Sequence, residues 1–209
     1  DADITGPSIP MLFGMSGLPE PGPVGIRPLE SATGIKVMSM NFLLERDDRA
    51  VIWRGPLVGR AITQLWGDVM WGDLDYLLVD LPPGTSDASL TTMQSLPVQG
   101  IIMVTTPQSL ASMIVRKAVN MAQALKTPIV GVVENMAYFT CPDTGKQHMI
   151  FGESHTREVA EAAGAPIIAK LPINPEVATL CDAGKIEIVQ LPEVESLLDG
   201  FLQAVPISQ

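Results

Sequence analysis

The sequence has few cysteines, few basic residues and no long hydrophobic run. Its two cysteines, Cys141 and Cys181, are too few for a disulfide framework. The longest apolar runs, around residues 76–81 and 100–104, fall far short of the roughly 18 residues that cross a bilayer, so we expect no membrane partner. No charged and apolar leader opens the chain, which makes a cytoplasmic location the default expectation.

Acidic residues outnumber basic ones by 23 to 13, which gives a formal net charge of −10. A polyanion would be repelled across most of such a surface, so we expect no nucleic-acid partner. Hydrophobic residues make up 46% of the 209 positions, which excludes a disordered chain and is enough for one substantial core. We therefore expect a single domain over residues 1–209.

Short apolar runs alternate with segments of helical period, a pattern typical of a mostly parallel sheet flanked by helices on both faces. The pattern predicts strands at residues 35–40, 75–80, 100–106, 128–134 and 167–171, of which 75–80 is the clearest. It predicts helices at residues 57–70, 110–125, 156–163, 175–183 and 193–204. The stretch 15–28, rich in proline and glycine, should be a surface loop.

Polar residues follow the apolar runs, where an open parallel sheet binds its ligands. Asp80 ends one run and Gly84 follows in Asp-Leu-Pro-Pro-Gly-Thr. A strand-tip Asp can hold a water of a Mg²⁺ shell, and a nearby Gly lets backbone N–H groups approach a phosphate. The same residues also suit an ordinary turn.

Asn135 follows the run 128–134 and offers a donor and an acceptor that match an adenine edge. The alternative is a loop Asn that hydrogen-bonds its own backbone. Asp1 and Asp3 are suited to orienting a water or a metal, although a terminal acidic pair is more often solvated.

Residues 71–87, Trp-Gly-Asp-Leu-Asp-Tyr-Leu-Leu-Val-Asp-Leu-Pro-Pro-Gly-Thr-Ser-Asp, resemble the signature of the Mrp/ApbC family, P-loop ATPases that carry and deliver iron–sulfur clusters. Five further segments match in family order: 1–10, 53–56, 104–108, 134–136 and 150–152. The resemblance implies a deviant-Walker-A P-loop NTPase fold and a homodimer with ATP at the subunit interface.

The resemblance also implies roles for individual residues. Asp80 matches the Walker B Asp and Gly84 the switch II Gly. Asp1 and Asp3 match switch I, where one carboxylate positions the attacking water and the other supports Mg²⁺. Asn135 matches the base-reading Asn, and Leu171-Pro172 resembles the segment that lies against adenine.

The chain departs from the family at the phosphate loop. It contains no Gly-Lys-Gly-Gly-Val-Gly-Lys-Ser/Thr, and residues 1–10 read like the end of a buried strand running into a loop. We therefore expect the first strand, the P-loop and the first helix to be missing upstream. Each lost charge-assisted hydrogen bond is worth about 1.5–3 kcal/mol, so this chain alone should bind ATP poorly.

A second departure concerns the metal. Family members often carry Cys-Pro-x-Cys, whose thiolates bridge a 4Fe–4S cluster across the dimer, but here the motif reads Cys141-Pro-Asp-Thr144. Two Cys141 thiolates fall short of the four sulfur ligands that such clusters usually need. Asp143, His148 and Cys181 are substitute candidates. Arg54 and Arg116 suit the nucleotide, the dimer interface or surface ion pairs.

The leading hypothesis is an iron–sulfur cluster carrier that binds and hydrolyses ATP and delivers clusters to apo iron–sulfur proteins. One alternative is a non-enzymatic scaffold or interaction module that retains the fold. A partition or positioning ATPase is a third, but the signature at residues 71–87, the acidic balance and the lack of a basic amphipathic tail argue against it.

Overall fold

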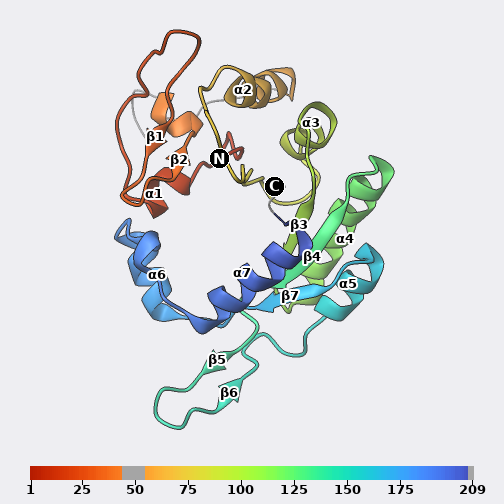
Figure 1. Cartoon of the computed structure of the whole chain (residues 1–209). Coiled ribbons are helices and arrows are strands. Elements are labelled where there is room, and N and C mark those ends of the chain that lie inside the picture. The colour runs from red at the N-terminus through yellow and green to blue at the C-terminus, as the bar shows by residue number, and fades with distance from the viewer. Residues whose placement is uncertain (44–54, 207–209) are drawn as a thin grey trace. The chain divides into compact units, whose positions relative to one another are not determined.

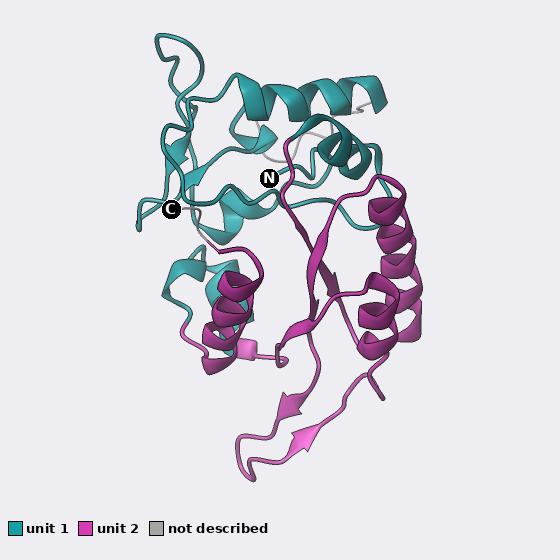
Figure 2. Ribbon diagram, turned by 45° about the vertical axis from the view of Figure 1, so that its right-hand side comes forward, with its two compact units in different colours: residues 1–96, 176–189 teal, residues 97–175, 190–209 magenta. Residues whose placement is uncertain are grey.

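The structure is a computed structural model that describes residues 1–43 and 55–206. These residues form two compact units, coloured separately in Figure 2. Unit 1 contains residues 1–96 and 176–189, and unit 2 contains residues 97–175 and 190–209. Trp53 and Arg54, part of one family-like segment, lie outside the described residues. In the described ranges, no helix is both long enough and apolar enough to cross a membrane.

Unit 2 is built on a parallel sheet of three strands in the order β3-β4-β7. These are β3 (Ile101–Thr105), β4 (Ile129–Glu134) and β7 (Ile167–Lys170), which confirm three of the predicted strands. Thr105 pairs with Glu134, and Glu134 pairs with Lys170, so the carboxyl ends of all three strands align. The residues that follow the strands therefore meet at one edge of this sheet.

Helices cover both faces of the sheet in unit 2. Figure 2 shows α4 (Ser109–Ala124) and α5 (Thr156–Ala163) on one face and α7 (Pro192–Ala204) on the other. The buried stripe of α4 includes Val119 and Ala122, which are fully buried. Gly164 ends α5 with a φ of +65°, the left-handed cap that glycine adopts without strain. The predicted α/β layering is confirmed.

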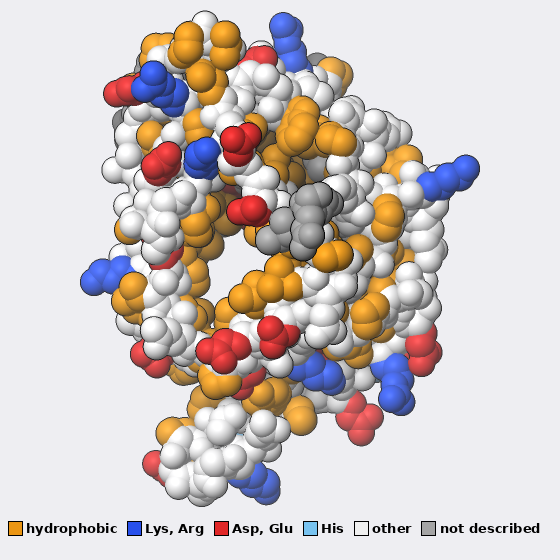
Figure 3. Space-filling view, in the orientation of Figure 1, with side chains coloured by type: hydrophobic (Ala, Val, Ile, Leu, Met, Phe, Trp, Pro, Cys, Tyr) orange, Lys and Arg blue, Asp and Glu red, His pale blue; other side chains and the backbone are white. Residues whose placement is uncertain are grey.

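An antiparallel hairpin of β5 (Phe139–Thr140) and β6 (Gln147–His148) extends from the carboxyl edge of the sheet (Figure 1). Its surface in Figure 3 is mostly backbone and uncharged side chains. The strands are too short to show a hydrophobic alternation, and the sequence did not predict them.

Unit 1 packs around an apolar cluster formed by residues near the start of the chain, in α2 and in α3. Glu187 ties the later segment 176–189 into this unit, since its carboxylate accepts a hydrogen bond of 2.6 Å from the Ser31 hydroxyl. The core residues are Ala2, Ile4, Val58, Ala61, Ile62 and Ala88. The helices and strands of unit 1 are α1 (Ile9–Leu12), β1 (Leu29–Glu30), β2 (Lys36–Val37), the 3₁₀ helix η1 (Met40–Leu43), α2 (Gly55–Gly67), α3 (Asp87–Ser95), α6 (Pro175–Asp182) and the 3₁₀ helix η2 (Ile186–Ile188). The first residue of α6, Pro175, is the last residue of a unit 2 segment.

Of the two strands predicted in unit 1, one is wrong and the other is confirmed only in part. Residues 75–80 form no strand ladder within the described chain, although the Ala2 N–H donates to the Asp80 carbonyl at 2.8 Å. Of their apolar side chains, Val79 packs on the core cluster, whereas Leu78 is exposed. Of residues 35–40, only Lys36–Val37 is a strand, because the chain turns into η1 at Met40. The predicted loop 15–28 is confirmed, with isolated bridges only.

Candidate functional site

The Asp1 carboxylate is held by its own unit. Oδ1 accepts from the Asp3 N–H at 3.3 Å, and Oδ2 accepts from the Ile9 N–H at 3.3 Å and the Ser39 hydroxyl at 3.0 Å. Ser39 is fully buried. A carboxylate with three donors is fixed in place, so Asp1 acts as an anchor for the first residues and for the start of α1.

The Asp3 carboxylate accepts two hydrogen bonds through the same oxygen. Its Oδ1 accepts from the Thr5 hydroxyl at 3.0 Å and the Gly6 N–H at 3.1 Å, which closes a local turn. Both donors lie within three residues, and both hydrogen bonds are exposed. The hydrogen bonds of the Asp3 carboxylate thus lie in an exposed local turn, whereas the Asp1 carboxylate also accepts hydrogen bonds from Ile9 and Ser39, which are more distant in sequence.

Asp80 lies in the same unit as Asp1 and Asp3. Partial burial raises the pKa of its carboxyl above the ordinary value, and the negative charge of Asp3 adds to the rise. Asp3 and Asp80 are therefore close enough to interact electrostatically. Gly84 follows with a φ of +79°, a conformation that favours glycine over any residue with a Cβ.

Helix α3 begins at Asp87, three residues after Gly84. The Ser86 hydroxyl oxygen accepts a hydrogen bond of 3.2 Å from the Ser89 N–H and so caps the helix. The Asp80–Gly84 turn thus leads into a capped helix. Sequence reasoning missed α3 because it has no hydrophobic stripe, although Ser86 and Asp87 form a readable start signal.

In unit 2, Asn135 lies at the carboxyl end of β4. Its backbone N–H donates to the Thr105 carbonyl at 2.8 Å, and its side-chain Oδ1 accepts from the Met136 N–H at 2.9 Å. The local backbone contact expected of a loop Asn is thus present. Oδ1 retains capacity for a second hydrogen bond and the amide nitrogen has two donors, so the group can still read a base edge.

The segment after β7 lies beside the segment after β4. The Leu171 N–H donates to the Glu134 carbonyl at 2.8 Å, the Ala137 N–H to the Leu171 carbonyl at 2.9 Å, and the Ile173 N–H to the Tyr138 carbonyl at 2.7 Å. Pro172 stands between two of these bonded residues. The structure therefore places Asn135 and Pro172 in neighbouring segments at one edge of the sheet. Asp80 belongs to unit 1, and its meeting with Asn135 stays a prediction.

Glu134 and Lys170, the last residues of β4 and β7, form an ion pair that the sequence analysis did not identify. The Lys170 Nζ lies 3.0 Å from Oε2 of Glu134, whose side chain is buried. Lys170 also lines a hollow of about 280 Å³ between β7 and the first turn of α7. Charged residues that directly follow apolar runs are the signal that could have revealed the pair.

Cys141 lies at the end of β5, in the turn of the hairpin. Its backbone N–H donates to the Lys146 carbonyl at 2.9 Å, and its carbonyl accepts from the Gly145 N–H at 2.8 Å. The Thr144 hydroxyl, then the backbone N–H groups of Thr144 and Asp143, hydrogen-bond the sulfur and lower the pKa of the thiol. A thiol in this setting yields the thiolate that binds metals more readily.

The substitute ligands form no complete metal centre. In residues 1–43 and 55–206, no group of three or more His, Cys, Asp and Glu side chains is arranged to hold a metal ion. His148 pairs with Phe139 across the hairpin. Cys181 lies half-buried on α6, in unit 1.

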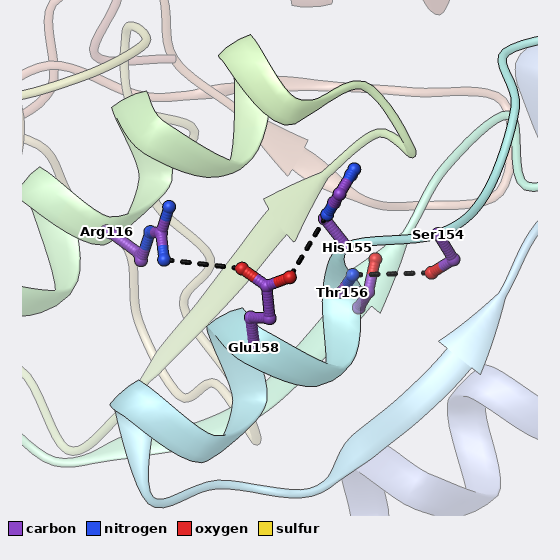
Figure 4. Close-up of polar contacts among 5 residues, drawn as sticks. All are labelled: Arg116, Ser154, His155, Thr156 and Glu158. Carbon is purple, nitrogen blue, oxygen red and sulfur yellow. Dashed lines mark hydrogen bonds and ion pairs between the residues drawn. The ribbon is translucent and has the colours of Figure 1, made fainter.

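Arg116 on α4 forms an ion pair of 3.4 Å with Glu158 on α5, whose other oxygen lies 3.1 Å from Nδ1 of His155 (Figure 4). The Arg116 and Glu158 side chains are about half exposed. Surface pairing, one of the predicted alternatives, is thus observed for Arg116.

Comparison with known proteins identifies the family. A ParA family model, described as NUBPL iron-transfer P-loop NTPase, matches residues 1–205. The chain belongs to this family. The iron–sulfur cluster carrier protein of Saccharolobus solfataricus is 42% identical over 195 residues, covering 92% of this chain and 66% of the relative. That of Clostridium perfringens is 45% identical over 211 residues, covering 96% of this chain and 74% of the relative.

Solved structures of P-loop NTPases agree with the fold. The nucleotide-binding protein of Archaeoglobus fulgidus, in complex with ADP, is 42% identical with a TM-score of 0.80, and the match covers 93% of this chain and 76% of that one. The MinD cell division protein of Aquifex aeolicus shares the fold at 13% identity and a TM-score of 0.53, over 96% of this chain and 82% of its own. The chain spans only 54% of the length of the iron–sulfur cluster carrier protein of Aquifex aeolicus.

Proposed function

We propose that the chain supplies the switch segments, the base-reading edge and the cluster-bearing hairpin of an iron–sulfur cluster carrier that binds and hydrolyses ATP. The observation that carries the proposal is the family match over residues 1–205. The names of the relatives and the ADP bound by the Archaeoglobus protein support it. A homodimer, apo iron–sulfur recipients and a cytoplasmic location complete the proposal and rest on the family resemblance.

The nucleoside would bind at the edge of unit 2. The Asn135 amide offers two donors and an acceptor to the adenine edge, and the ring of Pro172 offers an apolar surface to the base. The backbone bonds between residues 134–138 and 171–173 hold these two groups at a fixed spacing. Such a preformed edge costs little reorganisation when a base binds.

The family resemblance assigns the phosphate end of the nucleotide to Asp3, Asp80 and Gly84 of unit 1. Mg²⁺ in nucleotide sites takes one or two carboxylates together with phosphate oxygens, and Asp3 and Asp80 fit that donor set. Burial raises the pKa of Asp80 and the negative charge of Asp3 adds to the rise, and a bound divalent cation would favour the ionised form of both carboxylates. Bound Mg²⁺ would neutralise phosphate charge, while the flexible backbone at Gly84 allows an N–H group to approach the terminal phosphate.

Of the two switch carboxylates, Asp3 is the better candidate for orienting the attacking water. Asp1 has three donors from its own unit, and moving it would break the bonds to Ile9 and Ser39. Asp3 uses Oδ1 in an exposed turn. A carboxylate positioned in this way can accept a hydrogen bond from water without losing its own support.

The cargo would be held at Cys141. Two copies of the chain supply two such thiolates, and Thr144, where relatives often have a second Cys, donates to the sulfur instead of binding iron. Because a 4Fe–4S cluster usually needs four sulfur ligands, the remaining positions must be filled by other groups, and a loosely held cluster results. Loose holding suits a protein that passes the cluster on.

Anaerobic reconstitution of the natural full-length protein with iron and sulfide tests the cluster site. Visible absorbance and bound iron per chain should fall to background in Cys141→Ser. The matched control, Cys181→Ser, should keep the parent level, because Cys181 lies on α6 outside the hairpin. Equal iron in the Cys141→Ser variant and the parent would remove Cys141 from the proposal.

The lack of a phosphate loop in the sequence favours a second candidate for the 209 residues taken alone, a non-enzymatic scaffold. The isolated chain should hydrolyse no ATP above background, and fusion to an upstream Gly-Lys-Gly-Gly-Val-Gly-Lys-Ser/Thr segment of the kind that the resemblance implies should restore turnover. Rapid hydrolysis by the isolated chain would contradict the importance assigned to the phosphate-loop Lys.

A further inference from the structure

Glu134 carries a fully buried carboxylate at the carboxyl end of β4. Its position is one residue before Asn135, the group proposed to read the base. A buried charge needs compensation from nearby groups, since water no longer solvates it. The groups that compensate it come from two other segments of unit 2.

Lys170, at the end of β7, is the charged partner, with Nζ 3.0 Å from Oε2. The hydroxyls of Ser154 and Thr156 also approach the carboxylate from the start of α5. Burial alone raises the pKa of Glu134, but Ser154, Lys170 and Thr156 together outweigh it and leave the pKa below its ordinary value. The carboxylate is therefore ionised at neutral pH.

The start of α5 is itself ordered around these hydroxyls. The Thr156 N–H donates to the Ser154 hydroxyl oxygen at 3.3 Å, as Figure 4 shows. Thr156 is fully buried, and within the described residues neither its hydroxyl nor the Glu134 carboxylate forms a well-aligned hydrogen bond. The cluster is held by charge and close approach, which makes its geometry sensitive to the charge on Glu134.

The backbone of Glu134 belongs to the same edge. Its carbonyl accepts from the Leu171 N–H at 2.8 Å, and the next contact along the edge joins the Ala137 N–H to the Leu171 carbonyl. Asn135 directly follows Glu134, and Pro172 lies two residues after Lys170. Side-chain and backbone bonds of one residue therefore connect the segments that carry both proposed base contacts.

We propose that Glu134 is a positioning residue that, through Lys170 and the Ser154–Thr156 hydroxyls, sets the spacing of Asn135 and Pro172 and thereby the selectivity for the purine base. This role rests on the proposed nucleotide site at the same edge. Glu134 itself is covered by protein atoms and acts on the base only through its neighbours.

A purely structural role would give a different result. Replacement of a buried ion pair by neutral groups is often tolerated in stability, so loss of stability alone does not distinguish the two roles. Base selectivity does, because it depends on where the Asn135 amide points. Pyrophosphate binding, which does not involve the base, provides the internal reference.

The experiment measures dissociation constants for ADP, GDP and pyrophosphate in the natural full-length protein and in its Glu134→Gln and Lys170→Met variants. We expect the preference for ADP over GDP to fall by up to about tenfold in both variants, the effect of one misplaced hydrogen bond, with pyrophosphate affinity unchanged. Glu158→Gln, which breaks the exposed pair with Arg116, is the matched control and should keep the full preference.

Backbone hydrogen exchange keeps the test usable if Glu134→Gln folds poorly. In Lys170→Met, the Ala137 and Ile173 amides should exchange faster than in the parent, whereas the Val119 region of α4 should not change. A parent that binds neither nucleotide would overturn the proposed function and this role with it. A parent that prefers ADP, with variants that keep both the preference and the slow exchange, would overturn the positioning role alone.

Discussion

The Glu134 carboxylate and the Lys170 ammonium meet at 3.0 Å, yet the Glu134 side chain is 1% exposed and that of Lys170 48% exposed. The Glu134 charge therefore depends on Lys170 for compensation more than the Lys170 charge depends on Glu134. Lys170 retains contact with water if Glu134 is neutralised, but Glu134 without Lys170 is a buried charge with only hydroxyl groups near it.

Lys170→Met should destabilise the protein by about 2–4 kcal/mol at pH 7, because it leaves Glu134 without its cation. The loss of unfolding free energy caused by Lys170→Met should become smaller in acid. The folded pKa of Glu134 is below the ordinary value of 4.5, so its stabilising effect is complete above pH 4.5 and is lost as the pH falls through the lowered pKa. Urea unfolding at pH 7 and in steps below pH 4.5 measures both effects.

The control for this prediction is Arg116→Met. It breaks an exposed ion pair of 3.4 Å and should cost less than about 1 kcal/mol. Equal losses in the two variants, or a Lys170→Met deficit that grows in acid, would show that the buried pair is not the stabilising contact described above.

Substitutions of Asp1 and Asp3 should have different effects on stability and on ATP hydrolysis. Asp1→Ala removes a carboxylate that accepts three hydrogen bonds and should cost about 2–3 kcal/mol of unfolding free energy. Asp3→Asn keeps a side-chain oxygen for the turn and should change stability by less than about 1 kcal/mol while lowering ATP hydrolysis. Thermal unfolding and turnover measured on both variants check the contrast, and the reverse pattern would assign the water-positioning role to Asp1.

Asp80→Asn should stabilise the protein slightly while impairing Mg²⁺-dependent nucleotide binding. The folded pKa of Asp80 is raised, so the ionised form is less favourable in the folded than in the unfolded chain, and removing the charge helps at pH 7. Solvent screening at this exposed side chain limits the gain to less than about 1 kcal/mol. The gain should vanish in acid, where Asp80 is protonated in both states; a melting series against pH tests this.

Thr144 should control the reactivity of Cys141. Thr144→Val removes the hydroxyl that contributes most to lowering the pKa of the thiol, so the pH at which alkylation becomes fast should rise. Thr144→Cys places a second thiol in the same turn and should increase the iron retained after reconstitution. An unchanged alkylation profile in Thr144→Val would show that the backbone N–H groups alone set the thiol pKa.

Much of unit 2 was predictable because each of its elements has a clear hydrophobic period. The runs that became β3, β4 and β7 are rich in branched residues and bounded by proline or glycine, and α4 and α5 have a regular buried stripe. Asn135 was singled out because it follows a predicted strand, whereas Pro172 was singled out only by the family resemblance.

Unit 1 was predicted less well, since its local pattern does not determine its structure. Residues 75–80 have the composition of a strand, but a strand also needs a partner at hydrogen-bonding distance, which no periodicity reveals. The buried Glu134 and the Thr144 contact to Cys141 were also invisible, because the partners of a polar side chain depend on segments that are distant in sequence or on turn geometry.

Titration of Mg²⁺-ATP into the natural full-length protein, into Asp80→Asn and Asn135→Ala, and into the double variant tests the central claim that both residues serve one nucleotide. The account predicts that each single change weakens binding by about tenfold or more, with the Asp80→Asn loss dependent on Mg²⁺ and the Asn135→Ala loss dependent on the base. Unchanged ATP affinity in the double variant would contradict it.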